Sequence, residues 1–442
     1  MNLIDLFTKQ KVSYVLTYCL LILHFIGGNI ANLSILITSL WIFYYIIFVR
    51  NLDLYLIFLL LIPTIVFSEQ NSLDSFSNNI TLFSGFKNVW IIGPFALSSA
   101  FMMVLAVPFR CIIELRKTTP KFLTILWLIN ILMAFGGLII ALFLKTENPS
   151  GLTVGFRIAL TIGTLLITKT VTDKKTFFES FDKIILVSFL LLILGLLSAH
   201  WVFIVFGFIP YFWHRIKPKI FSLVPLVFSF NIFYNLNNTI TILGILFVSI
   251  LSYCIINWSK IMRKLLLNRK FILLIITIPI VITIFTLSLK KSGVYDTSTI
   301  KGYAEFKLLG DRKPIWDASW DDIWSSPFFI KPAGGKLIVY FDFLNEWQEW
   351  TPGSHNIFLE IGRQISAFSM ISFIIIILVS LYRLGKYIES KNDLIVFYCF
   401  LSVYLVFGLT GQSLIYNGVG ALFWLLLGQF YQVLFYNDQK LS

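Results

Sequence analysis

Two stretches decide how this chain is organised: GDRKPIWDASWDDIW at residues 310–324 and WTPGSHNIFLEIGRQIS at residues 350–366. Both lie in the one long polar segment of the chain, residues 290–365, which an apolar run borders on each side. Connecting loops in compact domains are usually far shorter than this segment. If the protein is an enzyme, we therefore expect its reacting groups to meet here.

The rest of the chain is strongly apolar. Of its 442 residues 58% are hydrophobic, and the mean hydropathy is +0.85, whereas soluble globular proteins contain only about 45–50% apolar residues. Long apolar runs alternate with short basic connectors, which is typical of helical membrane proteins. The sequence thus predicts an all-α fold: a polytopic transmembrane bundle of about 12–14 spans, with one large periplasmic loop containing short amphipathic helices.

The expected organisation has an N-terminal transmembrane bundle over 1–289, a catalytic loop over 290–365 and C-terminal transmembrane helices over 366–442. With the N-terminus in the cytoplasm, most of the 35 Lys and Arg residues fall on the cytoplasmic connectors. This distribution predicts that both termini are cytoplasmic and that the loop is periplasmic. The expected spans are 12–30, 33–49, 52–67, 90–109, 122–144, 152–168, 184–198, 199–213, 220–235, 239–258, 271–289, 366–382, 393–410 and 413–435.

Several kinds of site are not expected. The net charge of +13 is spread over alternate connectors and forms no basic stripe, which argues against nucleic-acid binding. The cysteines lie in or beside apolar runs, so we expect neither a disulfide nor a CxxC metal site. No Walker, GxGxxG or HExxH motif occurs, and ATP hydrolysis is not expected.

Residues 314–325 are predicted to form an amphipathic helix. Pro314 suits the first helical turn, and Trp316, Trp320 and Trp324 recur at every fourth residue. Such a stripe is typical of a helix in the membrane interface. The two aspartates after Trp320 could instead bind a divalent metal ion, although we favour the wet face of an interfacial helix.

Polar residues on either side of this helix are candidates for catalysis. Arg312 precedes it, and a guanidinium binds phosphate through two parallel hydrogen bonds. His355 and Asn356 follow a Thr-Pro-Gly-Ser turn and are expected to open an apolar helix that continues into the next span. The helix N-terminus should keep His355 neutral, so that it can accept a proton from a hydroxyl. Arg363 would share its face of that helix about two turns further on.

Arg157 is the one basic residue within a predicted span. A buried Arg in a bilayer is costly unless it is paired or faces water, which makes it a functional candidate near the outer end of its helix. For Arg157, as for Arg312, the alternative is a side chain that snorkels to the headgroups or forms an ordinary ion pair.

This order of residues resembles a known family. It comprises an intramembrane Arg (Arg157), an Arg-x-x-x-Trp element in a long external loop (Arg312 and Trp316), the sequence Pro-Gly-Ser-His-Asn-Ile-Phe-Leu-Glu, and three closing spans. It resembles the bacterial O-antigen polymerase and O-antigen ligase superfamily, over residues 300–366 above all. Ligases usually have a Gly at the position of Ser366, so the polymerase is favoured and the ligase is the alternative.

The resemblance implies a glycosyltransferase that needs no metal or other cofactor and takes its glycan from undecaprenyl pyrophosphate. Arg157 and Arg312 would neutralise the leaving pyrophosphate, and His355 would deprotonate or orient the acceptor hydroxyl. The residues implied in substrate binding are Asn356, Trp316 and Arg363. Expected partners are the lipid-linked glycan, membrane lipid, a chain-length regulator and a flippase. The expected location is the bacterial inner membrane.

Other classes of function make different predictions. A transporter or lipid-glycan flippase should carry several ionisable groups deep in different helices, and the predicted spans contain almost none. A two-carboxylate glycosidase could use Asp317 or Glu360, but hydrolysis would consume the activated donor without a product. A structural scaffold would tolerate point changes in the loop.

Overall fold

The structure is a computed structural model of the 442-residue chain. It describes residues 15–16, 19, 40, 89–92, 95–98, 121–144, 199–215, 239–289, 295–332, 337–350, 354–386 and 391–410. Most of this part of the chain is helical, as the composition predicts. Other predicted spans lie wholly or largely outside the described residues: 12–30, 33–49, 52–67, 152–168, 184–198, 220–235 and 413–435.

Long helices occupy the remaining predicted spans except one, with ends close to the predicted ones. They are α7 (Lys121–Phe143), α10 (Ala199–Arg215), α12 (Thr239–Trp258), α14 (Arg269–Ser288), α18 (Ala367–Lys386) and α19 (Lys391–Thr410), with the short α13 (Lys260–Leu266) before α14. Within the described residues, α14 is the one helix that meets both the length and the apolar composition needed to cross a membrane. Shorter apolar helical stretches are Gly244–Trp258, Ala367–Val379 and Leu394–Tyr404.

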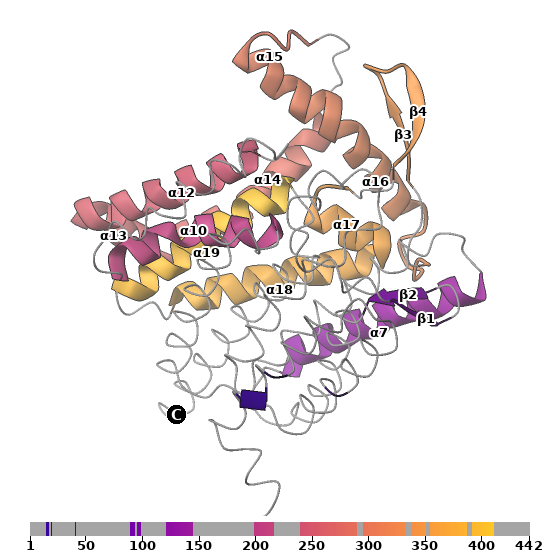
Figure 1. Ribbon diagram of the computed structural model, residues 1–442, viewed down its shortest axis with the longest axis horizontal. Helices are drawn as coiled ribbons and strands as arrows, with labels where there is room; N and C mark the ends of the chain where they lie inside the picture. The colour runs from indigo at the N-terminus through magenta and orange to yellow at the C-terminus, as the bar shows by residue number, and fades with distance from the viewer. Residues whose placement is uncertain are drawn as a thin grey trace, which may run out of the picture.

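These helices pack side by side. α10, α12 and α19 contact one another, α14 lies against α18 and α19, and α18 also contacts α7 (Figure 1). Phe206, Tyr211 and Ile245 are fully buried in the first group. A Cβ at Gly207 would lie 2.3 Å from Cγ2 of Val403, so the glycine allows α10 and α19 to approach closely.

Contacts near the helix ends define relative directions. The Tyr398 hydroxyl, near the start of α19, donates a hydrogen bond to the carbonyl of Leu266 at 2.8 Å, so α14 and α19 begin at the same end. His214 and Tyr253 lie 6.5 Å apart between ring centroids, so α10 and α12 finish at one end. If consecutive predicted spans cross the membrane in opposite directions, α10 and α12 must run in the same direction, and so must α14 and α19.

The predicted loop holds its own set of elements. These are α15 (Ile300–Glu305), the π-helix η5 (Phe306–Arg312), α16 (Lys313–Ser325), the antiparallel strands β3 (Leu337–Phe341) and β4 (Glu346–Trp350), and α17 (Ile357–Gln364). α15, η5 and α16 follow one another along one side, and the β3–β4 hairpin stands beside them (Figure 1). The predicted helix over 314–325 is confirmed as α16.

Two hydrogen bonds tie this set to the last turns of α14. The ammonium of Lys313, at the start of α16, donates to the carbonyl of Leu287 at 3.0 Å. The Asn356 amide, at the start of α17, donates to the hydroxyl of Thr283 at 2.8 Å. The starts of α16 and α17 are therefore fixed to one end of α14.

The structure corrects the predicted all-α fold in two places. The segment 90–109 was expected to be a helix, but its first part belongs to the antiparallel strands β1 (Val89–Ile92) and β2 (Phe95–Ser98). Aromatic and β-branched residues favour strands, and the Gly-Pro pair between the two is a turn signal. The hairpin β3–β4 was not predicted either, although Leu337, Val339 and Phe341 alternate with less buried residues as in a strand.

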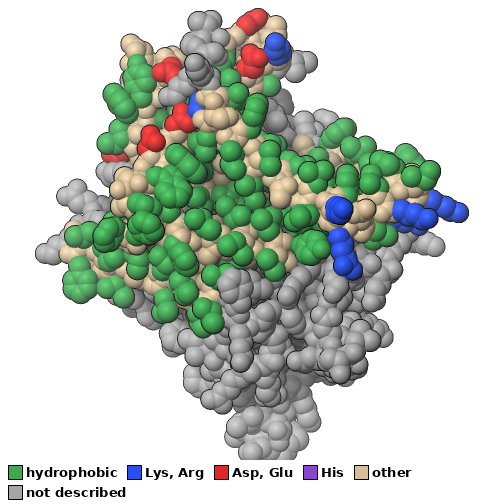
Figure 2. Space-filling view, turned by 180° about the vertical axis from the view of Figure 1, so that it is seen from behind, with side chains coloured by type: hydrophobic (Ala, Val, Ile, Leu, Met, Phe, Trp, Pro, Cys, Tyr) green, Lys and Arg blue, Asp and Glu red, His purple; other side chains and the backbone are tan. Residues whose placement is uncertain are grey.

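Charged side chains gather at opposite ends of the described region. The largest groups of blue side chains lie at the end that carries α13. Most of the red ones lie toward the loop elements, with some blue among them, and hydrophobic side chains cover the surface between the two ends (Figure 2). The large apolar residues exposed on α14 include Leu274, Val281, Ile284 and Phe285. Exposed apolar surface thus separates a basic end from an acidic one.

Candidate functional site

His355 has an unusual backbone conformation. Its φ is 52°, in the left-handed region that few residues other than Gly adopt. The neighbouring Ser354 and Asn356 are both fully buried, whereas His355 is partly exposed. Such a conformation costs about 1–3 kcal/mol and persists where the surroundings enforce it. Contacts on both sides of His355 provide that constraint.

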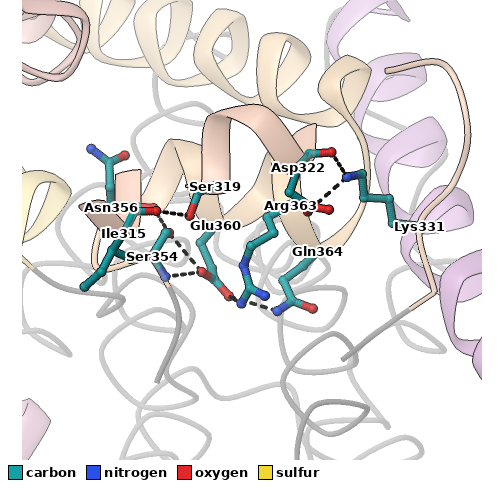
Figure 3. A network of polar contacts seen from close by, with 9 residues as sticks. All are labelled: Ile315, Ser319, Asp322, Lys331, Ser354, Asn356, Glu360, Arg363 and Gln364. Carbon is teal, nitrogen blue, oxygen red and sulfur yellow. Dashed lines mark hydrogen bonds and ion pairs between the residues drawn. The ribbon is translucent and has the colours of Figure 1, made fainter. Parts of the chain in front are cut away.

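On one side, Ser354 is held by Glu360. The Ser354 backbone N–H donates to Oε2 of Glu360 at 2.6 Å, and the Ser354 hydroxyl donates to the same oxygen at 2.9 Å. The other carboxylate oxygen accepts hydrogen bonds from the Arg363 guanidinium at 2.9 Å and the Gln364 amide at 3.0 Å (Figure 3). One buried carboxylate therefore links the segment before α17 to the last turn of that helix.

On the other side, Asn356 caps α17. Its carbonyl oxygen accepts from the backbone N–H groups of Phe358 at 3.0 Å and Leu359 at 3.3 Å, and its amide donates to Thr283. Asn is among the best N-cap residues for this reason. The side chain joins the start of α17 to α14 and leaves the backbone at residue 355 little freedom.

Glu360 is ionised in this network. Burial raises the pKa of its carboxyl, but the charge of Arg363 and the hydrogen bonds from Ser354 and Arg363 outweigh that effect and lower the pKa overall. The fully buried carboxylate is charged at neutral pH and already accepts four hydrogen bonds. It is not suited to be the protonated acid of a two-carboxylate glycosidase.

η5 brings two cations to one face. In a π-helix the backbone hydrogen bonds join residues five apart, and the N–H of Lys313 bonds the carbonyl of Leu308 in this way. Lys307 and Arg312 are also five apart, so the π-helix stacks them on one side; five residues of an α-helix turn about 140° further than one full turn. Single π-helical turns often occur at functional sites.

The positive charges of Lys307 and Arg312 act on His355. Burial lowers the pKa of the imidazole well below its usual value, and the positive charges of Arg312 and Lys307 lower it further. Burial also lowers the pKa of Arg312, with Asp311 opposing, but an Arg side chain keeps its charge at neutral pH. The arrangement is a neutral imidazole near two cations, of which Lys307 is paired with Asp311 at 3.0 Å. Positive charge beside a neutral imidazole suits an anionic ligand together with a hydroxyl that must lose a proton.

The pKa of His355 is lowered, as the sequence predicts, but for a different reason. His355 precedes the cap residue and does not belong to α17, so the argument that Arg363 shares its helix face is wrong. α17 also ends at Gln364 and does not run on into α18. The expected effect of the helix N-terminus is replaced by burial and by two neighbouring cations.

The three residues predicted to bind substrate are buried. Trp316 is 1% exposed, Asn356 0% and Arg363 6%. Asn356 donates a hydrogen bond to Thr283 and Arg363 donates one to Glu360, and both bonds hold α17 in place. The indole N–H of Trp316 is buried and has no hydrogen-bond partner within the described residues. Arg157 lies outside the described residues.

Sequence reasoning missed Lys307 and Ser354. Lys307 carries no local motif, since only the π-helical register sets it beside Arg312. Ser354 and Glu360 stand in the quoted stretch, and their spacing across the start of α17 is the signal that could have identified them.

The acidic residues of α16 do not gather into a group. Asp322 pairs with Lys331 at 2.9 Å and Asp317 with Lys313 at 2.8 Å, and the described residues include no group of three His, Cys, Asp or Glu able to hold a metal ion.

The chain was compared with protein-family models, with curated proteins and with solved structures, and it matches none of them.

Proposed function

We propose that the protein is a bacterial O-antigen polymerase, a membrane glycosyltransferase that joins oligosaccharide repeat units carried on undecaprenyl pyrophosphate at the periplasmic face of the inner membrane. The observation that carries this proposal is the neutral imidazole of His355, whose pKa is lowered by burial and by the charges of Arg312 and Lys307. A diphosphate leaving group needs fixed positive charge, and the acceptor hydroxyl needs a nearby base.

The proposed topology is a polytopic bundle with both termini in the cytoplasm. The relative directions of α10 and α12, and of α14 and α19, support it. So does the separation of charge, because Lys and Arg concentrate on cytoplasmic connectors of membrane proteins (Figure 2). The starts of α16 and α17 would then lie at the periplasmic end of α14.

The proposed step is a displacement at the anomeric carbon of the donor sugar. The acceptor hydroxyl oxygen forms a bond to that carbon as the bond to the pyrophosphate oxygen breaks and its electron pair leaves with the pyrophosphate. The hydroxyl proton passes to His355. Arg312 binds the leaving group through its planar fork, and Lys307 adds a second cation. Arg157 remains the proposed third cation on the strength of the family resemblance alone.

Substrate charge should make His355 a better base when it is needed. In the free protein burial and the two cations keep the imidazole neutral, and they also weaken it as a base. A bound diphosphate would offset those cations and raise the pKa of His355. The acid limb of kcat should therefore lie at higher pH than the acid limb of kcat/KM, because kcat reports the enzyme–substrate complex.

The location of buried charge favours this enzyme over a transporter. Within the described residues, the buried charged side chains are Lys313, Lys331, Glu360 and Arg363, all of them in the loop segment. A transporter that moves a charged substrate should instead carry ionisable groups in several long helices.

Lipopolysaccharide from a strain lacking this gene tests the proposal. Loss of a polymerase leaves single repeat units on the lipid A-core. Loss of a ligase leaves undecorated core while long polymer stays on the lipid carrier. A normal ladder would contradict both assignments. The purified protein with lipid-linked repeat units should also form a ladder without any added protein.

A further inference from the structure

We infer that α13, with the residues on either side of it, forms a binding surface for anionic phospholipid headgroups. The inference rests on the part of the proposed function in which α14 crosses the membrane, and it does not depend on glycan chemistry. We call this area the basic surface, and define it by Lys260, Lys264, Arg269 and Lys270 together with Trp258 and Ile261.

The basic surface carries uncompensated charge. All four cationic side chains are exposed, and no ion pair joins them to an acidic residue in the described part of the chain. In the sequence, no Asp or Glu stands between Asp182 and Asp296. Lys260 and Lys264 are also one helical turn apart, where like charges repel. Within the described part of the chain these four charges are therefore not neutralised, which leaves them available to an anionic ligand.

Arg263 differs from these four cations. Its guanidinium donates two hydrogen bonds to the carbonyl of Ile256, at 3.1 and 2.8 Å, near the end of α12. These bonds fix the corner between α12 and α13, which holds the neighbouring lysines on a rigid turn.

Apolar side chains stand among the cations. Trp258 is 83% exposed and Ile261 is 81% exposed, although both are large hydrophobic residues. Tryptophan beside lysine is typical of the membrane interface, where the indole ring sits at headgroup depth and the ammonium reaches phosphate. The surface continues directly into α14, whose exposed Leu274 and Val281 would face lipid tails.

These features together identify the occupant. A soluble acidic protein would neutralise the charge but would leave the indole and the Ile261 side chain in need of an apolar cover. An anionic phospholipid supplies both a phosphate and an acyl chain, and basic residues beside a transmembrane helix bind such lipids.

The test uses the full-length protein in detergent micelles, titrated with phosphatidylglycerol or phosphatidylcholine and followed by native mass spectrometry. The parent should retain phosphatidylglycerol preferentially, and the preference should fall as salt rises. A variant carrying Lys260→Gln, Lys264→Gln, Arg269→Gln and Lys270→Gln should lose about fivefold in affinity for each cation removed.

The matched control keeps the charge at the same positions, with Lys260→Arg, Lys264→Arg and Lys270→Arg, and it should bind as the parent does. Equal binding of the two lipids, or a glutamine variant that binds phosphatidylglycerol like the parent, would overturn the inference. If the quadruple variant does not fold, the double variant Lys260→Gln and Lys264→Gln decides between the same two outcomes. This experiment does not measure glycan transfer. A negative result would therefore overturn the lipid-binding surface without bearing on the proposed enzyme, which the lipopolysaccharide experiment tests separately.

Discussion

Two groups of residues meet at His355, and they differ in almost every physical respect. Lys307 and Arg312 come from a π-helix, are partly or largely exposed, and act on the imidazole through their charge. Ser354 and Glu360 are buried and bonded within the protein, and they act through the backbone. The contrast shows that a short polar stretch can contain one residue suited to chemistry among several that hold it in place.

The largest expected effect is on the rate of glycan transfer, when a residue proposed to act in transfer is replaced and the buried residues that hold it in place are kept. His355→Ala should lower the rate of glycan transfer by about 10²–10⁴-fold, because no base then takes the hydroxyl proton. Arg312→Ala should do the same, and Arg312→Lys should also fail because Lys lacks the planar fork. Ladder formation by purified variants measures the effect.

The matched control is His214→Ala on α10, far from the loop elements in the sequence, which should keep the parent rate. Normal ladders from both His355→Ala and Arg312→Ala would show that neither residue takes part in transfer.

The second-largest expected effect is on stability, when the buried pair of Glu360 and Arg363 is broken. Glu360→Gln leaves the buried Arg363 guanidinium without its counter-charge, and breaking a buried pair costs about 3–5 kcal/mol. Chemical unfolding in detergent measures the loss. Glu305→Gln is the control, because its pair with Lys301 is exposed and should contribute little.

The double variant Glu360→Leu and Arg363→Met sharpens this comparison. Removing both charges should recover part of the lost stability, because no uncompensated charge remains buried. Recovered stability with transfer still present would mean that Arg363 is structural. Recovered stability with transfer abolished would mean that transfer needs either Arg363 itself or the anchoring of Ser354 by Glu360.

A smaller effect is expected where α17 packs on α16. A Cβ at Gly362 would lie 2.7 Å from Cδ1 of Ile323, so Gly362→Ala should cost about 1–3 kcal/mol of unfolding free energy through overpacking. At Gly244 the nearest atom to a new Cβ is Cγ1 of Val406 at 3.7 Å, so Gly244→Ala should be neutral or slightly stabilising. Equal melting temperatures for the two variants would contradict the close approach of the helices.

The smallest effect concerns pH. Transfer needs neutral His355, so kcat/KM should fall on acidification only below the usual imidazole pKa of about 6.5. Lys307→Gln removes one of the charges that lower this pKa, and the acid limb should move to higher pH. Lys301→Gln removes an exposed lysine elsewhere in the loop and should leave the limb in place. An unmoved limb in Lys307→Gln would remove Lys307 from the site.

The sequence alone determined the features that depend on local composition. Apolar runs correctly predicted the positions of α7, α10, α12, α14, α18 and α19. The apolar run 90–109 is the exception, because its first part forms β1 and β2. Pro314 and the repeated Trp residues likewise located α16. Arg312 and His355 were identified by their residue types and neighbours, and the charges of the structure link them.

The tertiary structure decided what each polar residue does. Asn356, Trp316 and Arg363 were predicted from the sequence to contact substrate, and the structure buries all three. Asn356 caps α17 and Arg363 pairs with Glu360. Lys307 and Arg312 share one face because of a π-helical register, which no residue pattern in the sequence predicts. The pKa of His355 depends on burial and on charges from a different helix, and those distances exist only once the chain is folded.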